Sequence, residues 1–213
     1  MADNAIIGMG RRLGPSRLGL ILLLNLIPVT GVLWLGWDAG QILMLYWIEN
    51  VAIGAASLAR ILTARGVGEP VSGNGPSGPV ALGCFFTVHY GVFTIVHGVL
   101  TMVLAARLMG GAGELWARTF ADPVFHWAVL AMVAVQIVIL ARDWWRSGLW
   151  RRSTPFMEMF RPYGRIVVLH VTVLAAAWWL SETSAPVWAV LILCLTKAVV
   201  ELVLTALTSP AET

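Results

Sequence analysis

The chain has 213 residues, of which 59% are hydrophobic and only 12% are charged. An ordinary soluble domain carries roughly 25% charged residues, so this chain has too few charges to cover a water-soluble globule. Its net charge of +3 comes from arginines in a few short connections, which argues against a nucleic-acid partner and favours an all-α integral membrane protein.

Six apolar runs are each long enough to cross a bilayer as a helix, which needs about 20 residues. They cover residues 18–36, 41–62, 80–106, 122–141, 164–181 and 186–207. The first run follows several arginines, but no small-residue cleavage site comes after it, so we interpret it as a span and not as a signal peptide. The connections are short, which predicts a single bundle of six transmembrane helices over residues 1–213.

The arginines predict how these spans are oriented. If the N-terminus is cytoplasmic, eleven arginines fall on the cytoplasmic side and two, Arg107 and Arg118, on the outer side. Cytoplasmic connections of membrane proteins carry an excess of basic residues. We therefore expect both termini in the cytoplasm.

The second run carries an ionisable residue inside an apolar stretch. Helical spacing places Tyr46, Glu49 and Asn50 on one face of this span. A carboxylate in the hydrocarbon costs about 2.5 to 3.5 kcal/mol on insertion scales, so it needs a partner or a function. We expect this face to point into the bundle.

The third run contains a polar stripe. Thr87, Tyr90, Thr94, His97 and Thr101 recur at spacings of three and four residues, as one face of a helix requires. His89 lies about 100° around the helix from Tyr90. Glycines on the same helix favour close packing of helices, so we expect the stripe to be buried.

The connection after the fourth run is rich in arginine. Between residues 142 and 165 it has six arginines interleaved with tryptophan, phenylalanine and methionine. This composition is typical of a helix lying in the membrane interface, predicted here over residues 142–163, with anionic headgroups as its partner. Arg165, at the end of this segment, is predicted to contact headgroups or to close the cytoplasmic entrance. His126 and Gln136, in the fourth run itself, are interpreted as structural.

The last two runs add further titratable groups. His170 lies in the fifth, and Lys197 and Glu201 lie one turn apart in the sixth, where they can neutralise each other. Counting about 1.5 Å per residue, Glu49, His89 and Lys197 fall near the midplane of the membrane. The predicted polar centre therefore consists of Tyr46, Glu49, Asn50, His89, Tyr90, His97, His170, Lys197 and Glu201.

Several of these residues form recognisable local patterns. They are Tyr46-Trp47-Ile48-Glu49-Asn50, His89-Tyr90-Gly91-x-Phe93, Pro162-Tyr163-Gly164-Arg165-Ile166 followed by His170, and Lys197 with an acid four residues later. Together they resemble an uncharacterised family of prokaryotic multi-pass membrane proteins. In that family the last acid is Asp, where this chain has the longer Glu201. The resemblance implies a multi-pass protein of a prokaryotic inner membrane and supplies no activity.

Three functions are compatible with such a polar centre. Proton-, ion- or metal-linked transport would use the groups as titrating or coordinating residues, and we favour it slightly. An accessory or structural subunit would use them to hold helices together. A membrane-embedded metal-dependent enzyme would use Glu49, His89 and His170 as ligands of a transition metal. Since His89 and His97 are about 12 Å apart along one helix, a single metal site needs ligands from several helices.

Overall fold

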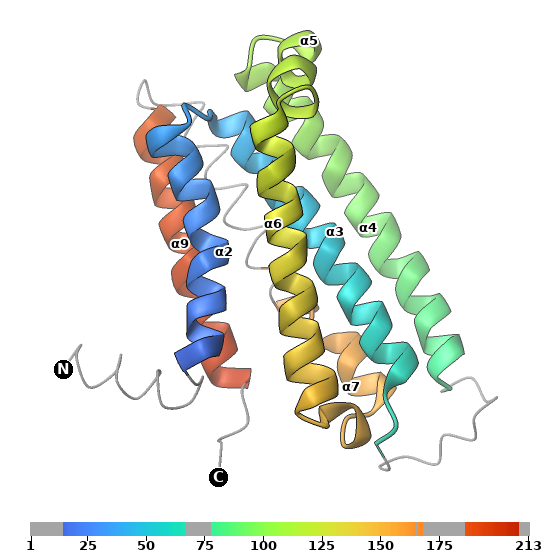
Figure 1. Cartoon of the computed structure of the whole chain (residues 1–213). Coiled ribbons are helices and arrows are strands. Elements are labelled where there is room, and N and C mark those ends of the chain that lie inside the picture. The colour runs from blue at the N-terminus through green and yellow to red at the C-terminus, as the bar shows by residue number, and fades with distance from the viewer. Residues whose placement is uncertain (1–14, 67–77, 165, 168–185, 209–213) are drawn as a thin grey trace. The chain divides into compact units, whose positions relative to one another are not determined.

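The computed structural model describes residues 15–66, 78–164, 166–167 and 186–208, and within these ranges the chain is helical with no strand. The chain divides into two compact units, one of Met1–Asp38 with Val167–Thr213 and one of Ala39–Ile166. The described helices of the first unit are α2 and α9, and all the others belong to the second (Figure 1).

In the first unit, α2 (Pro15–Trp34) and α9 (Pro186–Thr208) lie side by side and run in opposite directions (Figure 1). After α2 the chain turns back on itself through Gly36, whose φ of 68° favours glycine. The Trp37 ring then rests directly on Gly31, where a side chain would collide with it. The backbone N–H of Trp37 donates to the carbonyl oxygen of Gly31 at 2.9 Å and closes this turn.

In the second unit, the long helices are α3 (Ala39–Thr63), α4 (Pro79–Leu108) and α6 (Pro123–Leu140). These three, with α6 extended through Arg146, are long and apolar enough to cross a membrane. Residues 18–34 form a shorter apolar helix. The membrane character expected from composition therefore has structural support.

Glycines let α3 and α4 approach closely. Gly54 of α3 lies under the Tyr90 ring, and Gly98 of α4 lies under the Trp47 indole, where an added Cβ would be 2.6 Å from Nε1. Small residues of this kind allow helix backbones to come close together in lipid. The two helices are thereby fixed in register along most of their length, and α6 packs along α3.

Two short helices connect α4 to α6 at one end of this unit. They are α5 (Ala112–Leu115) and the π-helical turn η1 (Trp116–Phe120). Gln41 near the start of α3 donates from Nε2 to the carbonyl oxygen of Arg118 at 2.6 Å. Asp122 caps the start of α6 by accepting a hydrogen bond from the backbone N–H of Val124.

The arginine-rich connection after α6 is not one helix. It consists of the π-helical turn η2 (Ala141–Arg146), the short 3₁₀ turn η3 (Leu149–Arg151) and α7 (Pro155–Phe160), which we call the arginine-rich cap. Gly148, with φ of 72°, ends the first turn, and Pro155 cannot continue a helix from the residues before it. The prediction of one continuous interfacial helix over residues 142–163 is therefore wrong, because this segment forms three short helical elements.

The helix boundaries agree with the apolar runs to within three residues at each described end. The runs at 18–36, 41–62, 80–106, 122–141 and 186–207 correspond to α2, α3, α4, α6 and α9. The fifth run, residues 164–181, lies almost entirely outside the described residues. Six spans and cytoplasmic termini thus stay predictions.

Candidate functional site

Six of the buried polar residues of α3 and α4 lie in the middle turns of these helices, and we call them the polar strip. They are Tyr46, Glu49 and Asn50 of α3, and Tyr90, Thr94 and His97 of α4. Their burial agrees with the helical faces predicted for both runs. Thr101 is buried as well, whereas Thr87 is exposed and its hydroxyl donates to the carbonyl oxygen of Gly83 in its own helix.

Tyr90 and Asn50 link the two helices directly. The Tyr90 hydroxyl lies 2.8 Å from the carbonyl oxygen of Asn50 and 3.0 Å from its side-chain Oδ1. This arrangement fixes the orientation of the Asn50 amide. Among the described residues, the buried Nδ2 of Asn50 and the buried hydroxyl of Thr94 have no hydrogen-bond partner. The polar strip thus keeps hydrogen-bonding capacity that the described residues do not use.

Trp47 of α3 contacts α4 on both sides of His97 in the sequence. Its indole Nε1 donates to the carbonyl oxygen of Thr94 at 3.0 Å and covers Gly98. His97 lies between these two contacts in the sequence of α4 and is therefore level with Trp47. The His97 ring is buried and stacks on Phe93, with ring centroids 6.4 Å apart.

Glu49 is a buried ionisable group near the middle of α3. Its exposed fraction is 3%, and it lies ten residues after Ala39 and fourteen before Thr63. At 1.5 Å per residue, these separations are about 15 and 21 Å. Burial of a carboxylate is costly unless polar groups hydrogen-bond or pair with it, so the surroundings of Glu49 must include such groups.

His89 does not belong to the polar strip. Its ring is exposed on another face of α4, stacks on Phe85 and places Nδ1 2.8 Å from the Tyr163 hydroxyl. Burial raises the pKa of the Tyr163 phenol, so the phenol keeps its proton and can donate it in this hydrogen bond. The sequence placed His89 and Glu49 in one polar centre, but in the structure His89 is exposed and Glu49 is buried.

The first unit contains a second buried polar cluster. Lys197 Nζ lies 3.2 Å from Glu201 Oε2, the ion pair expected from their spacing. Asn25 of α2 donates to the same Glu201 oxygen at 3.2 Å. Sequence analysis missed Asn25, although a lone amide inside the first apolar run was the available signal.

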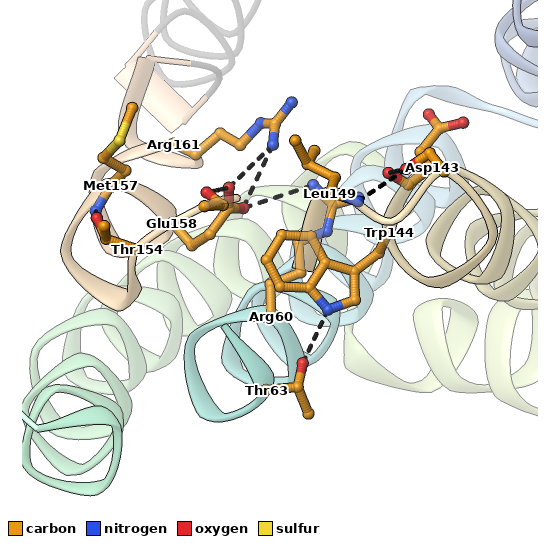
Figure 2. A network of polar contacts seen from close by, with 11 residues as sticks. Arg60, Thr63, Asp143, Trp144, Leu149, Thr154, Met157, Glu158 and Arg161 are labelled. Atoms are coloured by element: carbon orange, nitrogen blue, oxygen red, sulfur yellow. Dashed lines mark hydrogen bonds and ion pairs between the residues drawn. The ribbon is translucent and has the colours of Figure 1, made fainter. Parts of the chain in front are cut away.

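A third polar cluster holds the arginine-rich cap together (Figure 2). The buried Glu158 carboxylate accepts a hydrogen bond from Ser153 Oγ at 2.6 Å and lies 3.1 Å from Arg161 Nη1. Arg60 of α3 approaches the other oxygen at 3.9 Å. The sequence analysis did not single out Glu158, although Arg161 three residues later was a local signal; its approach to Arg60, almost a hundred residues away in the chain, depends on tertiary packing.

The metal ligands predicted from sequence are described only in part. His170 lies outside the described residues, as does Arg165. Glu49 is buried, whereas His89 is exposed beside Tyr163. Within the described ranges, no group of three or more histidine, cysteine or acidic side chains is placed to hold a metal ion.

Comparison with known proteins gives a family and no activity. A family model described as "Family of unknown function (DUF6498)" matches residues 10–213. No curated protein and no solved structure matches the chain. The matched range includes every described helix, so the polar strip, the Lys197 cluster and the arginine-rich cap all lie within the family region.

Proposed function

Because the chain belongs to the family of unknown function DUF6498, its relatives supply no activity, and we propose one from its own residues. The protein is a multi-pass membrane transporter in which Glu49 takes up and releases a proton or a small cation. The bilayer is crossed by six helices, with both termini in the cytoplasm. Membrane insertion follows from the apolar helices, and the transport role follows from the polar strip.

The observation that carries this proposal is the burial of Glu49 in an apolar helix long enough to cross a membrane. Ionisable residues in such helices are expensive to insert, and they commonly mark pathways for ions or protons. A second titratable residue of the polar strip, His97, is buried on the neighbouring helix α4. A carboxyl group and an imidazole in one helix pair are the usual components of a proton relay.

The neighbouring polar atoms support a bound water or ion. Asn50 Nδ2 and Thr94 Oγ1 are buried without partners in the described part of the chain. A water molecule needs two to four polar partners to occupy an interior site. The polar strip offers such partners along two mainly apolar helices, which supports passage of a small, hydrated or protonic species in preference to a large solute.

The proposal is tested by flux measurements on purified protein in liposomes. A potassium diffusion potential is imposed, and a pH-sensitive dye inside the vesicles reports proton entry, with sodium- and potassium-sensitive dyes in parallel. We expect flux above that of empty liposomes for the wild type. Glu49→Gln keeps the shape of the side chain but removes its charge, so we expect at least a tenfold loss of flux.

Glu114→Gln is the matched control, because Glu114 is exposed in the short helix α5. It should transport at the wild-type rate. Both variants are compared with the wild type for folded yield and melting temperature in detergent. Equal flux in folded Glu49→Gln and wild-type protein would contradict the proposal.

A structural subunit is the second candidate, and specific contacts favour it. Two hydrogen bonds join α3 and α4, one from Tyr90 to Asn50 and one from Trp47 to Thr94. Interhelical hydrogen bonds of this kind often serve packing alone. On this reading Glu49→Gln lowers the folded yield, and the wild type shows no flux of any of the three ions.

A further inference from the structure

We propose that the outward side of the arginine-rich cap binds the anionic headgroups of acidic phospholipids. The exposed side chains that form this headgroup surface are Trp145, Arg146, Arg151, Arg152, Phe156 and Phe160. The inference rests on the membrane placement in the proposed function, and it is independent of the chemistry of Glu49.

Five of the arginines at this end of the unit fall into two groups. Arg60 and Arg161 turn toward the buried carboxylate of Glu158, which offsets part of their charge inside the cap (Figure 2). Arg146, Arg151 and Arg152 are exposed, and the Arg151 guanidinium lies over the Trp150 ring, 4.8 Å from its centroid. Glu158 thus engages Arg60 of α3 and Arg161 within the fold, whereas three other arginines stay exposed.

The cap is fixed to the end of a helix that is long and apolar enough to cross the membrane. The backbone N–H of Arg65 donates to the carbonyl oxygen of Trp150 at 2.7 Å, and that of Gly66 to Ser153 at 2.9 Å. The fully buried Trp144 donates from Nε1 to Thr63 Oγ1, the last residue of α3, at 2.8 Å. These bonds hold the headgroup surface at the end of α3, where a membrane-crossing helix meets the headgroup layer.

The chemistry of the exposed side chains matches that layer. Phe156 and Phe160 stand together on one face of α7, with ring centroids 5.0 Å apart, and remain exposed. Aromatic rings favour the boundary between headgroups and acyl chains, while guanidinium groups form bidentate hydrogen bonds with phosphate. Positive charge beside exposed aromatic rings complements an anionic, amphipathic lipid surface.

The test compares lipid retention by three proteins purified from mixed phosphatidylcholine and phosphatidylglycerol nanodiscs under mild detergent. Wild-type protein should retain phosphatidylglycerol in excess of its share in the mixture. The variant Arg146→Gln/Arg151→Gln/Arg152→Gln should lower this enrichment by at least about fivefold, the effect of one arginine near an anionic surface. Arg107→Gln/Arg118→Gln, at the opposite end of α4 and in η1, should retain the wild-type enrichment.

Unchanged enrichment in the folded triple variant would overturn the proposal. The melting temperature is also measured with inorganic phosphate in pure phosphatidylcholine discs and with phosphatidylglycerol in mixed discs. An equal rise in melting temperature in both would overturn the proposal, because the surface would then be a phosphate site without lipid recognition. Glu49→Gln should retain phosphatidylglycerol normally, so a failure of the transport proposal is distinguishable from a failure here.

Discussion

The Tyr90 hydroxyl contacts two acceptors of a single residue on the neighbouring helix, Asn50. Tyr90→Phe removes these contacts and deprives the buried Oδ1 of Asn50 of this donor, whereas the Asn50 carbonyl keeps its bond within α3. We expect it to lower the free energy of unfolding by about 0.6 to 1.7 kcal/mol, which are the average and the largest values measured for hydrogen bonds between membrane helices. The Tyr163 hydroxyl contacts the exposed His89, so Tyr163→Phe should lower the free energy of unfolding by less. Unfolding in mixed micelles measures both, and equal stability of Tyr90→Phe and wild type would contradict the assigned role.

The Glu158 carboxylate contacts Ser153, Arg161 and Arg60 and thereby stabilises the arginine-rich cap. Removing one member of a buried ion pair costs about 3 to 5 kcal/mol, and less where the partner is partly solvated. Because the Arg161 side chain is 26% exposed, we expect Glu158→Gln to cost roughly 2 kcal/mol. Limited trypsin digestion should then cleave the cap faster than in the wild type. Glu114→Gln serves as the control, and an unchanged cleavage rate in Glu158→Gln would refute this role.

Single residues of the site were only partly predictable from the sequence. Helical periodicity placed Glu49, Asn50, Tyr90 and His97 on buried faces, as the structure has them. It also indicated that His89 faces elsewhere. Periodicity could not identify the partner of each residue, because a pairing such as Asn25 with Glu201 depends on how two distant helices pack.

At the level of the helices, close packing of α3 on α4 depends on Gly98. Gly98→Ala would place a Cβ 2.6 Å from the Trp47 indole nitrogen, so the indole must move and its bond to Thr94 is lost. We expect a loss of about 1 to 3 kcal/mol in unfolding free energy. Gly91→Ala, in the same helix with open space around the new Cβ, should be neutral or slightly stabilising. Equal effects of the two substitutions would contradict this packing.

The elements themselves differed in how well the sequence predicted them. Long apolar runs carry their own signal, since a helix is the simplest way to satisfy every backbone hydrogen bond in lipid. The arginine-rich cap carries no such signal, because its mixture of arginine and aromatic residues fits one interfacial helix as well as it fits a series of short turns. Gly148 and Pro155 were the local signals that it breaks into turns, and burial of Trp144 against α3 stabilises the result.

For the whole molecule, the distribution of arginines predicts an even number of spans. A reporter that becomes fluorescent only in the cytoplasm, fused in turn to the N-terminus and the C-terminus, should be bright at both ends. The same reporter inserted between α5 and α6 should be dark, because this connection is predicted to lie outside. A bright reporter there, or a dark one at either terminus, would contradict the six-span topology.

The central claim is that Glu49 exchanges a proton or a cation inside the membrane, and infrared difference spectroscopy of protein in liposomes tests it most directly. Spectra recorded at two pH values, and with and without sodium, should contain a carboxyl band that is absent in Glu49→Gln and present in Glu114→Gln. A folded Glu49→Gln protein with the same difference spectrum as the wild type would show that Glu49 does not bind the exchanging ion, and the transport proposal would be wrong.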